Sequence, residues 1–233
     1  RVGISHLVEH MFFKGTKQRS ASQLAKDTRA LGGYLNAETG YERTIYRTVV
    51  PAENTVPAMA IQADVLWNPS FDIEDLKREI ELVLQENDRR LDNPSAIASD
   101  RLHSTSFRAH RMGRWRIGSA NALRALTRED LIAFYKQYYQ PSNMILTIVG
   151  RFDREELLEE VLRSHGHADD EAVERDIGPS EVSQQGFRYN WERGDIGRAH
   201  IALGYRVPGI LSNDLYVVEV LRAILTSGRA SRL

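Results

Sequence analysis

The sequence of 233 residues contains no cysteine. A disulfide framework and thiolate chemistry are therefore excluded, and any metal ion has to be held by His, Asp or Glu side chains. Long apolar runs are also missing, since the longest aliphatic stretches, such as residues 144–149 (MILTIV), are much shorter than the roughly 18 residues that indicate a membrane span. We expect no membrane span.

An excess of charge of either sign is absent too. The 31 basic and 32 acidic residues leave a net charge of -1, which gives no general reason to expect a nucleic acid or an acidic membrane as partner. An apolar content of 42% is typical of a globular protein. Residues 107–116 (FRAHRMGRWR) combine arginines with aromatics in a way that RNA-binding segments do, but in a chain of balanced charge such a stretch is more often a surface loop.

Helical and strand-like patterns alternate along the chain. Capping residues, glycine stops and apolar periodicity predict helices, and β-branched or alternating residues predict strands. The expected helices lie within residues 1–16 and cover 20–33, 54–68, 72–90, 94–107, 127–139 and 152–166, and the expected strands cover 34–38, 43–50 and 142–150. We therefore predict an α+β fold with a mainly antiparallel sheet on which helices pack.

The pattern changes after residue 165. Residues 166–185 are polar and aperiodic and are predicted to be a linker between a first domain, 1–165, and the start of a second one, 186–233. The second unit begins with strands expected at 187–193 and 199–207 and a helix at 213–225. Because the chain starts inside a helical pattern and without methionine, we expect it to be a fragment or a processed product.

A weak internal repeat links the two units. When Gly228 is aligned with Gly15, the last helix is aligned with the first, and Glu219, Arg222 and Ala223 take the positions of the polar residues described next. The second unit would thus resemble the first without its polar triplet. A chance likeness between two amphipathic helices explains the same match.

The first helix carries the motif H-x-x-E-H. His6 and His10 are four residues apart, which places both rings on one helix face, and Glu9 lies beside them. A catalytic zinc ion takes three protein ligands and leaves a fourth position for water, so a further ligand must come from elsewhere. The alternative is a pair of helical histidines that only make hydrogen bonds at the surface.

A second set of candidate residues lies in the helix predicted at 72–90. Glu79 and Glu86 are two helical turns apart, with Leu82 and Val83 between them on an otherwise apolar face. A carboxylate on a buried face needs compensation, and a divalent cation supplies it directly. Ordinary salt bridges are the alternative role for both residues.

Together these segments resemble a known family. HLVEHMFFKGT followed by Glu86, with GGYLNAETGYERTIY at 32–46, REIELVLQEN, DNP, YYQPSNMILTIVG and SGRASRL, is similar to the pitrilysin and insulinase family of zinc peptidases, especially its two-domain bacterial members and the β subunit of the mitochondrial processing peptidase. The resemblance implies a processing-peptidase-like fold. It also implies site roles: His6, His10 and Glu86 as Zn²⁺ ligands, Glu9 as general base, Glu79 as support behind the ligands, Asn36 and Ala37 on a strand that pairs with a peptide, and Phe13 at the border of a substrate pocket.

The implied function is that of a zinc metalloendopeptidase acting on peptides or unfolded segments. Relatives carry a strand or two before the zinc helix and a complete second domain, so we expect the missing second domain or a partner subunit to close the cleft over the peptide. The alternative is a non-catalytic homologous subunit or scaffold of a processing-peptidase-like complex. The compartment stays open from the sequence, with the bacterial relatives favouring an extracytoplasmic, periplasmic location.

Overall fold

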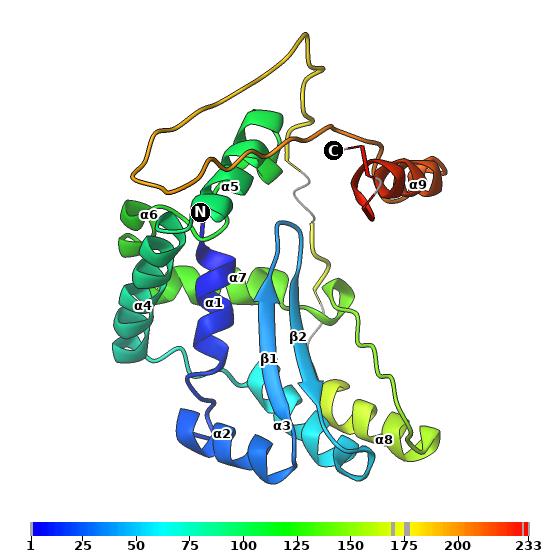
Figure 1. Ribbon diagram of the computed structural model, residues 1–233. Helices are drawn as coiled ribbons and strands as arrows, with labels where there is room; N and C mark the ends of the chain where they lie inside the picture. The colour runs from blue at the N-terminus through cyan, green and yellow to red at the C-terminus, as the bar shows by residue number, and fades with distance from the viewer. Residues whose placement is uncertain (1, 169–170, 175–177, 230, 233) are drawn as a thin grey trace.

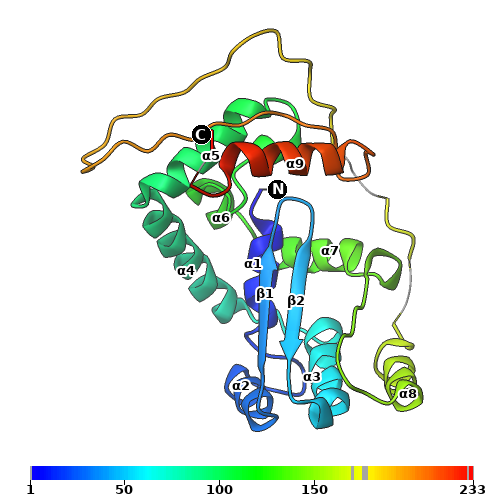
Figure 2. The ribbon, with the colours of Figure 1, turned by 45° about the vertical axis from the view of Figure 1, so that its right-hand side comes forward.

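The computed structural model describes residues 2–168, 171–174, 178–229 and 231–232. An antiparallel hairpin stands at its centre, with helices packed against it (Figures 1 and 2). The strands are β1 (Tyr34–Thr39) and β2 (Thr44–Val49). The α-helices of the described residues are α1 (Ile4–Phe12), α2 (Ala21–Ala30), α3 (Thr55–Trp67), α4 (Ile73–Leu91), α5 (Pro94–Ser106), α6 (Ala120–Arg124), α7 (Arg128–Tyr138), α8 (Arg154–His165) and α9 (Leu215–Thr226). The predicted α+β class is confirmed, although the sheet is small.

The helix boundaries follow from local capping chemistry. The Asp72 carboxylate accepts hydrogen bonds from the amides of Glu74 and Asp75 at the start of α4. Thr127 and Asp130 form a reciprocal capping box at the start of α7. Such caps satisfy amides that have no partner within the helix, so the sequence fixes where these helices begin.

The core is built around α1. Its side chains Leu7, Val8, Met11 and Phe12 have no exposed surface, and they pack with buried residues of α3, α4 and α7. The Phe12 ring lies against four other aromatic rings, among them Tyr46 of β2 at 5.2 Å between centroids. The opposite face of α1 is therefore fixed in position by the core.

Glycine is required where α1 begins. Gly3 has a φ of 91°, and a Cβ at this position would lie 2.3 Å from the carbonyl oxygen of Ile117. L-residues avoid this region, and the clash would be with backbone. The close approach binds the loop before α6 to the first turn of α1.

Three predicted strands are absent from the described residues. Residues 144–150 run without backbone pairing, and the Ile145 side chain is 93% exposed. A cavity of about 1840 Å³, lined by β2, α3, α7 and residues 143–152, separates this segment from the free edge of β2. A strand needs a neighbour about 4.8 Å away to pair its N–H and C=O groups, so the β-forming sequence alone is not enough.

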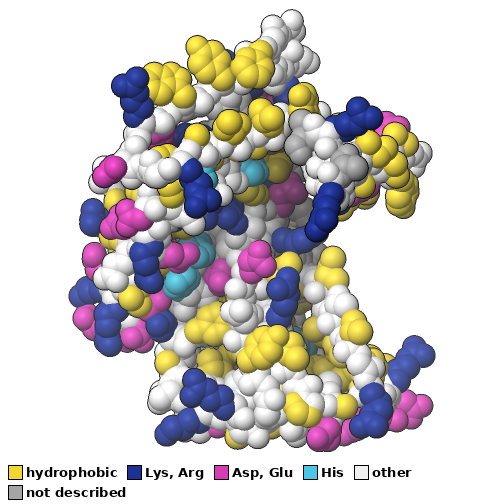
Figure 3. All heavy atoms as spheres, in the orientation of Figure 1, with side chains coloured by type: hydrophobic (Ala, Val, Ile, Leu, Met, Phe, Trp, Pro, Cys, Tyr) yellow, Lys and Arg dark blue, Asp and Glu magenta, His cyan; other side chains and the backbone are white. Residues whose placement is uncertain are grey.

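The strands predicted at 187–193 and 199–207 are wrong for the same reason. These residues adopt no strand, and their alternating apolar side chains stay in solvent, as shown by Tyr205 at 86% exposure. Hydrophobic side chains gather along the upper part of the face in Figure 3. The predicted helix near the C-terminus is present as α9, but none of its side chains is buried.

The division into domains 1–165 and 186–233 stays a prediction. The predicted linker, 166–185, forms no helix or strand where it is described, whereas residues 169–170 and 175–177 of it lie outside the described residues. No helix of the described chain is long and apolar enough to cross a membrane.

Candidate metal centre

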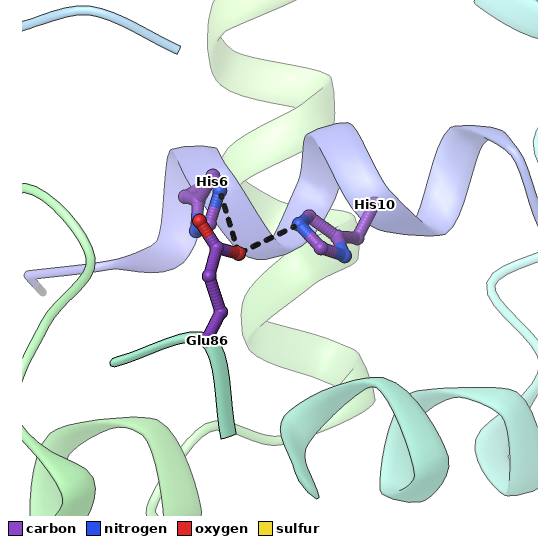
Figure 4. Close-up of side chains that lie close together, drawn as sticks. All are labelled: His6, His10 and Glu86. Carbon is purple, nitrogen blue, oxygen red and sulfur yellow. Dashed lines mark ion pairs between the residues drawn. The ribbon is translucent and has the colours of Figure 1, made fainter. Parts of the chain in front are cut away.

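The H-x-x-E-H motif lies on α1, and its third candidate partner comes from α4. Packing of the two helices through the core brings Glu86 to the rings of both histidines. Oε2 of Glu86 is 3.8 Å from Nε2 of His6 and 3.7 Å from Nε2 of His10, and both lines in Figure 4 meet at this one oxygen. His6 and Glu86 are 80 positions apart in the sequence, and their side chains nevertheless lie next to each other.

The separations fit a bound ion better than hydrogen bonds. The candidate ligand atoms of His6, His10 and Glu86 all lie within 4.8 Å of one another, and the N···O distances exceed the hydrogen-bond range. Two ligands at 2.0–2.1 Å from a tetrahedral zinc ion lie roughly 3.3 Å apart, which small side-chain rotations would achieve here. Two imidazoles and one carboxylate are also a donor set that zinc accepts.

Glu79 holds His10 from behind. Its Oε2 is 3.0 Å from Nδ1 of His10, and its Oε1 is 2.5 Å from Nζ of Lys14. The bond to Nδ1 selects the tautomer in which Nε2 carries the free lone pair, directed to the Glu86 side. Burial acts to raise the pKa of Glu79, but hydrogen bonds from His10 and Lys14 outweigh it and hold the pKa below its usual value.

The imidazole of His6 is favoured in its neutral form. Burial, and next the neighbouring His10, lower its pKa, while Glu86 acts in the opposite direction. A neutral imidazole is the form that binds a metal ion. Its Nδ1 is buried and finds no hydrogen-bond partner among the described residues, so His6 lacks the kind of support that Glu79 gives to His10.

Glu9 is a buried carboxylate beside this cluster. Burial raises its pKa, and a hydrogen bond from the Thr39 hydroxyl to Oε2 opposes the rise. A carboxylate whose affinity for a proton is increased in this way is suited to act as a base.

The site is accessible from one face. The Glu86 side chain is 46% exposed, and histidine side chains reach the surface over α1 with acidic side chains beside them (Figure 3). The large cavity beside β2 is not lined by His6, Glu9, His10 or Glu86. It is therefore distinct from the candidate centre.

Two of the three residues expected to contact a peptide lie on the hairpin, and the third follows α1. Asn36 and Ala37 lie in β1, which pairs with β2 on one edge and with no other described strand. The Ala37 amide donates a hydrogen bond to Oδ1 of Asn36, so a pairing peptide would have to displace this side chain. Phe13 is half-buried directly after α1, whereas its neighbour Phe12 is fully buried in the core.

Two contacts of the site were not foreseen from the sequence. Lys14 follows His10 by four residues, and this spacing was a usable signal for a shared helix face. Thr39 is 30 residues from Glu9, and no local pattern links the two positions.

Comparisons with known proteins place this geometry in context. The family model for insulinase (peptidase family M16) matches residues 1–119, and the model for the peptidase M16 inactive domain matches residues 125–233. An uncharacterized zinc protease from Rickettsia bellii is 30% identical over 237 residues, which cover 99% of this chain and 55% of that protein. A probable mitochondrial-processing peptidase subunit beta from Schizosaccharomyces pombe is 31% identical, over 96% of this chain and 50% of its own.

Solved structures agree in fold. A protease from Helicobacter pylori superimposes with a TM-score of 0.85 at 24% identity, over all of this chain and 57% of its own. The periplasmic protease PqqL from Escherichia coli gives a TM-score of 0.69 at 25% identity, over 77% of this chain and 21% of its own. The present chain spans about half the length of the curated relatives. By the match of its first half to the insulinase model and of its second half to the companion domain, this chain belongs to peptidase family M16, the insulinase family.

Proposed function

We propose that this chain is the zinc-binding part of a zinc-dependent endopeptidase that cleaves peptides or unfolded protein segments. The observation that carries the proposal is the convergence of His6, His10 and Glu86 on one point, with Glu9 buried alongside. Relatives named zinc proteases support zinc as the ion.

Each residue has a distinct task in the proposed reaction. Bound zinc would supply Lewis acidity, which lowers the pKa of water to about 7. Glu9 takes the proton from the attacking water and returns it to the leaving amine nitrogen, so it must be near the ion without binding it. His10 is kept in the correct tautomer by Glu79.

The peptide would bind as an added strand on the free edge of β1. Main-chain hydrogen bonds to the segment of Asn36 and Ala37 would provide affinity that depends little on sequence, with Phe13 at the border of a side-chain pocket. The remaining part of the natural protein, or a partner subunit as the name of the S. pombe relative suggests, would close over the peptide. The likeness to a periplasmic protease favours an extracytoplasmic location.

A second candidate is a non-catalytic homologous subunit or scaffold. It is favoured by the match of residues 125–233 to a model described as an inactive domain. However, all four residues of the candidate centre lie within the segment that matches the insulinase model. The proposal therefore assigns the chemistry to residues 1–119 and a non-catalytic role to the part that follows.

The test is cleavage of an unfolded protein by the complete natural polypeptide that contains this chain. Chelation should abolish cleavage, and added zinc should restore it. Glu9→Gln should retain zinc and reduce the rate by about 10²- to 10⁴-fold, because the base is lost while the ligands stay. Cleavage that survives chelation would exclude a metallopeptidase, and a Glu9→Gln variant with a normal rate would remove Glu9 from the reaction.

A further inference from the structure

We infer that Thr39 is a positioning residue that fixes the Glu9 carboxylate in its reactive orientation, through the hydrogen bond that joins the end of β1 to α1. This inference rests on the proposed function, since it assigns Thr39 a part in the same reaction. Thr39 would not touch the substrate or the ion, and it would act only through Glu9.

The hydrogen-bond donors at this point are fully determined. The Thr39 hydroxyl donates its single hydrogen to Oε2 of Glu9. The hydroxyl of Thr44 lies 3.3 Å from Oγ1 of Thr39 and must then be the donor in that second contact. Among the described residues, Thr39 provides the sole hydrogen bond of the Glu9 carboxylate, so Oε1 keeps its lone pairs for a proton.

The Thr39 backbone is held as firmly as its side chain. Thr39 and Thr44 form the last pair of the β1–β2 register, next to a turn closed by a 2.8 Å bond from the Gly40 amide to the Arg43 carbonyl. Arg116 donates from Nη1 to the Thr39 carbonyl oxygen at 3.2 Å. The Arg116 guanidinium also lies over the ring of Tyr41 in the same turn, 5.1 Å from the ring centroid.

This arrangement couples the base to the strand proposed to bind the peptide. Glu9 belongs to a helix held by the core, but a glutamate side chain has rotatable bonds that helix packing alone does not fix. A catalytic group must lie within about 0.5 Å of its productive position, and side chains behind it provide that precision. Thr39 lies two residues after Ala37 on β1. Its hydrogen bond therefore holds the Glu9 carboxylate in a fixed position relative to the strand edge proposed to bind the peptide.

The experiment compares Thr39→Val, Thr39→Ser and Thr48→Val in the complete natural polypeptide. Val keeps the β-branched shape and removes the hydroxyl, whereas Ser keeps the hydroxyl. Thr48 is the matched control, because it lies on the same hairpin and its buried hydroxyl has no hydrogen-bond partner in the described structure. Zinc content, kcat and KM are measured for each variant.

Thr39→Val should lower kcat roughly 10- to 100-fold, as expected for losing a hydrogen bond to a charged group, with zinc content and KM unchanged. Thr39→Ser should restore kcat to within about threefold of wild type, and Thr48→Val should leave it unchanged. An unchanged kcat in Thr39→Val would overturn the inference. A rise in KM with normal kcat would overturn it too, since it would show a role in peptide binding.

A second measurement tests the contact without any activity. In zinc-free protein, unfolding of Thr39→Val, Glu9→Met and the double variant forms a mutant cycle, and the double variant should be less destabilised than the sum of the single variants. Additive effects would refute the contact. If wild type does not cleave, the proposed function fails and the inference with it; a wild type that cleaves beside an equally active Thr39→Val variant refutes the inference alone.

Discussion

The support that Glu79 gives to His10 predicts a measurable loss of zinc affinity. Glu79 is a buried carboxylate whose Oε2 lies 3.0 Å from Nδ1 of His10. Removing the hydrogen-bond partner of a ligating histidine costs about 10- to 100-fold in metal affinity, which corresponds to about 1.4 to 2.7 kcal/mol. We expect Glu79→Gln to be near the lower value, because its amide oxygen still accepts from Nδ1, and Glu79→Met to be near the upper value.

The assay is competition for zinc against a chromophoric chelator, with circular dichroism to show that each variant is folded. Lys14→Met is the matched control, since it removes the other partner of Glu79 but leaves the bond to His10 intact. It should change zinc affinity by less than about threefold, because Lys14 contacts no ligand and reaches solvent. A folded Glu79→Met variant with wild-type affinity would refute the orienting role of Glu79. A loss in Lys14→Met as large as in Glu79→Met would show that charge, and not orientation, matters.

Two further predictions concern the frame around the site. Phe12→Ala should cost about 3 to 5 kcal/mol in urea unfolding, and Phe13→Ala, at a half-buried position, clearly less; equal losses would contradict the assigned core. Hydrogen bonds from the backbone amides of His110 and Ala109 hold the pKa of Glu181 down to about 2. Because this pKa is lowered on folding, the contact is stabilising above the ordinary pKa of a glutamate and is lost as pH falls through about 2. At neutral pH, Glu181→Gln should speed hydrogen exchange of the Ala109 and His110 amides. Unchanged exchange would show that these two hydrogen bonds do not protect the amides.

Sequence patterns predicted helices well because a helix satisfies its own backbone. Thr127 and Asp72 marked helix starts that the structure reproduces. The strand predicted at 142–150 was wrong because strand formation depends on a neighbouring strand, and these residues themselves hold no information on whether that neighbour is in place. The β1–β2 hairpin was predicted correctly since each strand brings its own partner through a short turn.

Within the candidate site, the sequence did not predict which side chains point inward. Leu82 was expected beside Glu79 and Glu86 on an apolar face, but it is 43% exposed while Val83 is completely buried. A straight helix turns about 20° short of two full turns over seven residues, so Glu86 is rotated relative to Glu79. Glu79 therefore lies inside, against His10, and Glu86 lies at the rim, where its carboxylate is partly in solvent.

Different elements of the fold hold the candidate ligands and the proposed peptide-binding edge. The three candidate ligands depend on α1 and α4, which meet through buried side chains of the core. The proposed peptide edge belongs to β1, which contacts Glu9 through the Thr39 hydroxyl and contacts Arg116 through the Thr39 carbonyl. We therefore expect that a change at the hairpin can misplace Glu9, the proposed base, while the cluster of candidate ligands stays intact. Zinc binding and turnover are thus expected to respond to different residues, although the residues responsible lie within one small region of the fold.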